Sequence, residues 1–157
     1  MDPTVLQFRM NRIEGYCDLG MWEDAEQERA ALGTLLDHNP AGRELKLRIL
    51  MGTGDWPRAV KLAMDLANEF PEQGHWFTHT AYCLHELGRT QEAREFLMTG
   101  PSSLKDDPLF YYNLACYECM LGRLDEARLL LGKAIERDAG LAKLARTDPD
   151  LKGIGGG

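Results

Sequence analysis

The sequence lacks the surface chemistry that nucleic acids and membranes require. Its 18 lysines and arginines are outnumbered by 25 aspartates and glutamates, which gives a formal net charge of −7, and no basic run occurs. Nucleic acids and anionic membranes attract proteins through clustered basic side chains. No segment approaches the roughly 20 apolar residues that span a bilayer. We therefore expect neither a nucleic acid nor a membrane as the partner.

Signals for export, metal binding and redox chemistry are also scarce. Residues 1–15 have no basic start followed by an apolar centre, so we expect no signal peptide and a cytoplasmic location. Among the four cysteines, Cys116 and Cys119 have the C-x-x-C spacing of zinc and redox sites. Zinc motifs place this spacing on a tight turn and need further ligands, whereas here it lies in a helical run without a second pair. We expect reduced thiols with a structural or groove-lining role, and neither a metal nor a cofactor.

The alternating pattern of a β-sheet is missing as well, and a helical repeat takes its place. Apolar residues recur every three or four positions, as they do in α-helices. Glycines recur every 34 residues (54−20, 88−54, 122−88), and an alanine follows five residues after each one. The pairs are Gly20 with Ala25, Gly54 with Ala59, Gly88 with Ala93, and Gly122 with Ala127. Such a period is typical of stacked helical hairpins, which usually offer a groove to another protein.

Local signals mark where the helices of each repeat begin and end. Asp2-Pro3, Asn39-Pro40 and Asp107-Pro108 each join an N-cap side chain to a proline at the first helical position, so they predict starts of first helices. The repeated glycines end these helices because glycine adopts the left-handed conformation readily. The alanines let the two helices of a hairpin approach closely near the turn. Gly100-Pro101 is expected to end the second helix of repeat three early.

These features resemble the tetratricopeptide repeat (TPR) family. The segment Tyr-Asn-Leu-Ala-Cys-Tyr-Glu-Cys-Met-Leu-Gly-Arg-Leu-Asp-Glu-Ala, which ends at Ala127, is similar to the family consensus almost throughout. The segment His-Glu-Leu-Gly-Arg-Thr-Gln-Glu-Ala, which ends at Ala93, also matches. Repeats one and two keep the glycine, the aromatic and the alanine. They depart from the family where it has an aromatic residue and a leucine, and carry Arg9, Arg12, Arg43 and Lys46 there.

The resemblance implies a fold and its boundaries. We expect an all-α, right-handed superhelical array of about four helix-turn-helix repeats, which forms a single domain over residues 1–147. The repeats would span residues 6–39, 40–73, 74–107 and 108–141. A short capping helix would lie within residues 139–147, and residues 148–157 would form a flexible tail.

The resemblance also implies a binding face, because the first helices of TPR folds line a concave groove. Its groove positions lie thirteen, ten, nine, six and three residues before each repeated glycine. The candidate peptide-binding residues at the groove positions are Asn11, Glu14, Arg48, His79, Tyr82, His85, Tyr112, Asn113, Cys116 and Cys119. Aromatic and thiol side chains concentrate in repeats three and four, where we expect a peptide or helix to bind. Arg48 is the expected groove cation and would orient one acidic ligand residue. The carboxylate clamp of TPR chaperone cofactors is not matched, since Met10 and Leu45 stand where that clamp has basic residues.

The leading interpretation is a non-catalytic module that binds a protein or peptide, as a scaffold, adaptor or chaperone. A type III secretion-like chaperone is an alternative, although such proteins carry a dimerising extension before their repeats and repeat one starts here almost at once. A small cysteine-based enzyme would use Cys116 as nucleophile with help from His79. A zinc-binding protein would use two histidines and two cysteines, namely His75, His79, Cys116 and Cys119. Self-assembly into a homodimer is also open.

Overall fold

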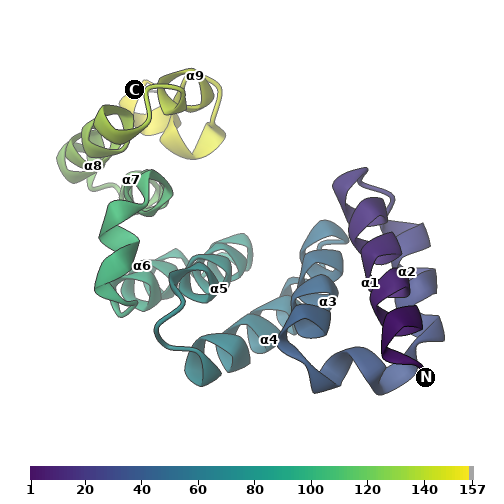
Figure 1. Cartoon of the computed structure of the whole chain (residues 1–157). Coiled ribbons are helices and arrows are strands. Elements are labelled where there is room, and N and C mark those ends of the chain that lie inside the picture. The colour runs from purple at the N-terminus through teal and green to yellow at the C-terminus, as the bar shows by residue number, and fades with distance from the viewer. Residues whose placement is uncertain (156–157) are drawn as a thin grey trace. The chain divides into compact units, whose positions relative to one another are not determined.

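The protein is built from helices. The computed structural model describes residues 1–155, and over this range it contains nine α-helices and three short 3-10 helices but no strand (Figure 1). This confirms the all-α class. None of the helices within residues 1–155 combines the length and apolar character needed to cross a membrane.

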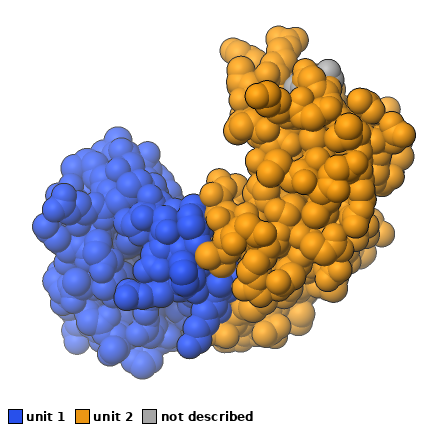
Figure 2. All heavy atoms as spheres, turned by 180° about the vertical axis from the view of Figure 1, so that it is seen from behind, with its two compact units in different colours: residues 1–62 blue, residues 63–157 orange. Residues whose placement is uncertain are grey.

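Internal contacts divide the chain into two compact units. They are Met1–Leu62 and Ala63–Gly157, coloured separately in Figure 2, and the division falls within helix α4 (Trp56–Glu69). The sequence predicted one domain over residues 1–147, so this division is finer than the prediction. Each unit is described by itself.

Unit 1 consists of a helical hairpin and a third helix packed against it. Its elements before α4 are α1 (Pro3–Asp18), α2 (Trp22–Ala31), η1 (Gly33–His38) and α3 (Pro40–Gly52). Helix α3 contacts α1, α2 and η1. The core between them contains Met10, Ile13, Cys17, Ala25, Leu32, Leu36, Leu45 and Ile49. The sequence did not predict the early end of α2, where Gly33 adopts a φ of 58° and η1 begins.

Unit 2 continues with two further hairpins and a C-terminal segment, residues 141–154. Its elements after α4 are α5 (Gly74–Glu86), α6 (Thr90–Met98), η2 (Ser102–Asp106), α7 (Pro108–Met120), α8 (Leu124–Arg137), α9 (Leu141–Ala145) and η3 (Pro149–Ile154). Helix α5 packs on α6, and α7 packs on α8 (Figure 1). The buried carboxylate of Glu118 on α7 accepts hydrogen bonds from Arg94 on α6 and from Arg123, the latter at 3.2 Å. This one acidic side chain therefore ties α6 and the start of α8 to α7.

The predicted helix boundaries are confirmed at the signals that carried them. Helices α1, α3 and α7 begin at the three prolines, and the preceding side chain caps each one. Asp2 accepts from the Thr4 N–H at 2.7 Å, and Asn39 accepts from the Gly42 N–H at 2.6 Å. Helix α6 ends at Met98, just before the Gly100-Pro101 break.

The four repeated glycines form the same turn each time. Their φ angles are 69°, 75°, 76° and 80° for Gly20, Gly54, Gly88 and Gly122. In each turn the residue after the glycine donates its N–H to a carbonyl five residues back, as Met21 does to Tyr16 at 2.8 Å and Arg123 does to Glu118 at 2.9 Å. The glycine N–H bonds a second carbonyl, which completes a Schellman motif. The alanine five residues later is fully buried in all four cases.

The C-terminal region is more ordered than the sequence predicted. The expected cap within residues 139–147 is present as α9, which contacts α8. The expectation of a flexible tail over 148–157 was wrong for η3, which packs on α7 and α8 and buries Leu151 and Ile154. Gly156 and Gly157, also part of that expected tail, lie outside the described residues.

The glycine turns predict that two matched glycine-to-alanine substitutions change the free energy of unfolding in opposite directions. Gly88→Ala should lower the free energy of unfolding by about 1–2 kcal/mol, because a side chain resists the left-handed conformation that φ of 76° requires. Gly132→Ala, on the exposed side of α8, should raise it by about 0.5–1 kcal/mol, because alanine favours a helix. An added Cβ meets no atom within 4 Å at either position, so packing does not confound the comparison. Chemical denaturation measures both changes in the free energy of unfolding. If the two changes have the same sign, the left-handed turn assigned at Gly88 is contradicted.

Candidate functional site

In unit 1, the predicted groove positions of repeats one and two form a pocket of about 140 Å³ between α1 and α3. Its lining residues are Gln7, Met10, Asn11, Glu14, Ala41, Glu44, Leu45 and Arg48. The structure therefore brings together three of the predicted site residues, Asn11, Glu14 and Arg48. All three come from first helices, as the resemblance implied.

The charge in this pocket differs from the expectation. Arg48 was expected to be a cation available to a ligand, but its guanidinium donates to Asp18 at 2.7 Å, and this hydrogen bond raises the pKa of Arg48. Glu14 and Glu44 present exposed carboxylates. Gln7 donates to the side-chain oxygen of Asn11 at 2.8 Å. The pocket therefore offers acidic and amide groups rather than a free positive charge.

In unit 2, a second pocket of about 240 Å³ lies between α5, α7 and the C-terminal segment. Its lining residues are Tyr82, His85, Leu109, Tyr112, Asn113, Cys116, Tyr117, Leu144, Asp148 and Asp150. Five of them are predicted site residues: Tyr82, His85, Tyr112, Asn113 and Cys116. His79 and Cys119 do not line it.

The C-terminal segment forms one wall of this pocket through polar contacts. Asp148 accepts a hydrogen bond at 2.7 Å from the Tyr112 hydroxyl and a longer one at 3.8 Å from the Cys116 thiol. Asp150 pairs with His85, with 2.8 Å between Oδ2 and Nε2, and the other ring nitrogen of His85 lies 2.9 Å from the Thr90 hydroxyl. These contacts hold the start of η3 against α5 and α7.

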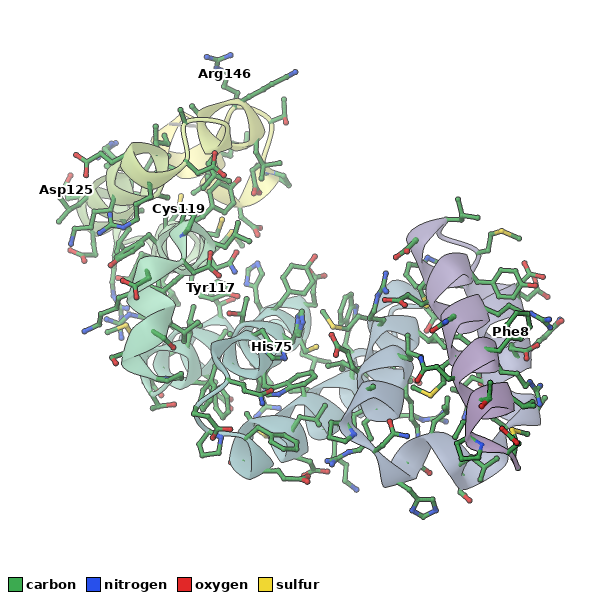
Figure 3. The ribbon with its side chains drawn as sticks, in the orientation of Figure 1. Phe8, His75, Tyr117, Cys119, Asp125 and Arg146 are labelled. Atoms are coloured by element: carbon green, nitrogen blue, oxygen red, sulfur yellow. The ribbon has the colours of Figure 1, made fainter. Side chains whose placement is uncertain are left out.

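As a result, several residues expected in an open groove are covered. Tyr112 and Cys116 are only 4% and 5% exposed, and Cys119 is also buried. A Cβ built on Gly153 of η3 would lie 3.1 Å from the Cys119 sulfur, so this segment packs closely on α7 (Figure 3). Tyr82, at 41%, keeps an accessible ring. Of these residues, Tyr82 is therefore accessible to solvent, whereas Tyr112 and the two thiols are not.

The thiol chemistry does not favour a cysteine nucleophile. Burial raises the pKa of Cys116, and the negative charge of Asp148 raises it further. A reactive cysteine needs the opposite shift, toward the thiolate. The hydrogen-bond partner of Cys116 is Asp148, rather than the His79 that the enzyme hypothesis requires.

The predicted zinc donors do not converge. His75, His79, Cys116 and Cys119 form no group, within residues 1–155, whose ligand atoms lie within 4.8 Å of one another. The two histidines instead lie beside Trp76 on α5, with 6.2 Å between their ring centroids. Burial lowers the pKa of His79, and the neighbouring His75 adds to this effect.

Sequence reasoning missed the residues that the C-terminal segment contributes, above all Asp148 and Asp150. A signal was present, because Asp148-Pro149 repeats the cap-and-proline pattern that begins α1 and α7. The Asp148 carboxylate indeed caps η3 by accepting from the Asp150 N–H at 3.0 Å. Tyr117 was also missed, since its position falls off the face expected to line the groove.

Truncating Leu151 tests whether the C-terminal segment belongs to the fold. Leu151→Ala should lower the free energy of unfolding by about 2–5 kcal/mol, because the side chain is fully buried and its loss leaves a cavity. The matched control is Leu144→Ala on α9, where the side chain is 51% exposed and the change should be small. Denaturation of both variants gives the comparison. If Leu151→Ala lowers the free energy of unfolding as little as Leu144→Ala does, η3 contributes nothing to stability.

The depressed pKa of His79 predicts acid sensitivity. Because burial disfavours the imidazolium, the unfolded chain binds a proton at this residue more readily than the folded chain. The free energy of unfolding should therefore fall as pH drops below about 6.5. His79→Gln should lose less stability than the unsubstituted protein between about pH 7 and pH 5.5. Urea denaturation at both pH values measures the difference, and an identical loss in both proteins would refute the assignment.

Comparisons with known proteins add no assignment. No protein-family model matches the chain, and no curated protein sequence is similar to it. Function is therefore inferred from the two pockets and from the residues that line them.

Proposed function

We propose that the protein is a non-catalytic, TPR-like module that binds a peptide or helix on the face formed by its first helices. The observation that carries this proposal is the composition of the two pockets. All eight residues of the unit 1 pocket, and six of the ten in unit 2, occupy groove positions implied by the TPR resemblance. The repeated glycine turn supports the same assignment, since it recurs with one geometry at the family's period. A right-handed superhelix and a role as scaffold, adaptor or chaperone are parts of this proposal.

The chemistry of the pockets suggests which ligand residues would bind. In unit 1, the exposed carboxylates of Glu14 and Glu44 favour a basic side chain, because opposite charges attract and guide encounter. Asn11 lies beside them and can hydrogen-bond a peptide backbone. In unit 2, Tyr82 offers a partly exposed ring suited to apolar contact. The unit 1 pocket therefore favours a lysine or arginine of a ligand, and the unit 2 pocket favours an apolar residue.

The alternatives have less support. Burial raises the pKa of the Cys116 thiol, and the charge of Asp148 adds to this effect, which weakens the cysteine-enzyme hypothesis. The secretion-chaperone and homodimer hypotheses stay predictions. Exposed apolar residues on α1, namely Val5 and Phe8, are compatible with self-association, but the Phe8 ring already carries the Arg12 guanidinium 5.3 Å from its centroid.

Capture of ligands by the immobilised full-length chain, followed by mass spectrometry and calorimetry with the identified ligand, tests the proposal. Tyr82→Ala should weaken binding by about 1–3 kcal/mol if this ring is an anchor. Glu44→Lys should also weaken binding, because it reverses the charge of the unit 1 pocket. The control is Leu129→Ala, which removes an exposed apolar side chain from the second helix α8. If only the control loses affinity, the first-helix face is not the binding site.

A further inference from the structure

Three potential metal ligands meet in the unit 2 pocket, although the sequence predicted no metal. Within residues 1–155, the Cys116 sulfur and one carboxylate oxygen each of Asp148 and Asp150 lie within 4.8 Å of one another. Cys116 comes from α7, whereas the two aspartates flank the start of η3. Only the folding of the C-terminal segment onto α7 brings these groups together.

Neighbouring residues fix the orientation of both carboxylates. The Tyr112 hydroxyl donates to Oδ2 of Asp148, and Oδ1 of the same carboxylate accepts the Asp150 N–H. His85 binds Oδ2 of Asp150 at 2.8 Å, and Thr90 holds the far side of the imidazole. Such outer hydrogen bonds are the usual means by which proteins orient metal ligands.

Tyr117 provides an independent observation that points to a ligand in the same pocket. Its side chain is only 2% exposed, and its hydroxyl has no hydrogen-bond partner within the described chain. The Tyr117 ring, labelled in Figure 3, packs against His85 with 5.1 Å between centroids. Tyr117 lines the same pocket as Cys116 and Asp150. Buried hydroxyls almost always have a partner. Solvent bound to a metal ion in this pocket would accept a hydrogen bond from the Tyr117 hydroxyl.

We propose that Cys116, Asp148 and Asp150 bind one divalent transition-metal ion, of which zinc fits best. A thiolate ligand selects zinc over magnesium or calcium, which prefer oxygen ligands alone. Three protein ligands leave a fourth position for solvent, the arrangement found in zinc sites that stay open. The proposal does not rest on peptide binding, because it is argued from Cys116, which is buried on α7, and from Asp148 and Asp150, which are half-buried on the C-terminal segment itself.

Binding requires one proton transfer and no change of oxidation state. The Cys116 thiol proton, which points to Asp148 Oδ2, is released to solvent as the sulfur–metal bond forms. The lone pair of Oδ2 that accepted this proton then becomes free to bind the metal. The net exchange is one metal ion bound for one proton released.

Cobalt(II) titration of the metal-free, reduced full-length chain tests the site, because a thiolate–cobalt bond gives a charge-transfer band in the near ultraviolet. We expect the band to saturate at one equivalent per chain and to disappear when zinc is added. Cys116→Ser should abolish the band, and Asp150→Asn should weaken cobalt affinity at least tenfold. The matched control is Cys119→Ser, which replaces another buried cysteine on the same helix and should leave the charge-transfer band unchanged.

Circular dichroism of each variant shows whether it is folded. If Cys116→Ser does not fold, Asp150→Asn decides the question, because its side chain is partly exposed and its loss costs the fold less. The proposal is overturned if the unsubstituted protein gives no charge-transfer band. It is also overturned if the band survives Cys116→Ser, if Cys119→Ser removes it, or if folded Asp150→Asn binds cobalt as tightly as the unsubstituted chain.

Discussion

The left-handed glycine turn is the constraint on which the rest of the structure depends. Each turn reverses the chain within a few residues, and its two backbone hydrogen bonds satisfy carbonyls at the end of the first helix. The reversal places a fully buried alanine where the second helix approaches the first. Because the turn recurs every 34 residues, the first helices present equivalent positions, and these positions line the pockets of both units. Local backbone geometry thus determines which side chains reach the candidate binding face.

The two pockets share this origin but differ in chemistry. In unit 1 the face stays open and carries acidic and amide groups, with Arg48 engaged by Asp18. In unit 2 the C-terminal segment covers part of the equivalent face and brings two further carboxylates to it. Buried apolar residues of η3 hold the segment in place, so its polar groups need not supply the packing energy. Under the two proposals, one face of unit 2 would serve peptide contact at Tyr82 and ion binding at Cys116.

The sequence predicted the local features well because each had a local cause. Proline and its capping neighbour fixed the starts of α1, α3 and α7, and the glycines fixed four helix ends. The failures involved residues far apart in the chain. Tyr112 and Cys116 looked accessible because Asp148, which covers them, lies 36 and 32 residues away. Arg48 looked free because its partner Asp18 belongs to the preceding repeat. The superhelical arrangement and the partner stay predictions.

The unit 2 pocket also has a consequence for how the protein is made. Its floor, on α5 and α7, leaves the ribosome before residues 148–154, which carry the aspartate wall. Domains fold from the N-terminal side as they are synthesised. During synthesis the residues of α5 and α7 therefore emerge before Asp148, which covers Tyr112 and Cys116 in the folded chain. The pocket is complete only when residues 148–154 have been made. Any function that needs both the floor and the aspartate wall therefore begins only after translation has passed Ile154.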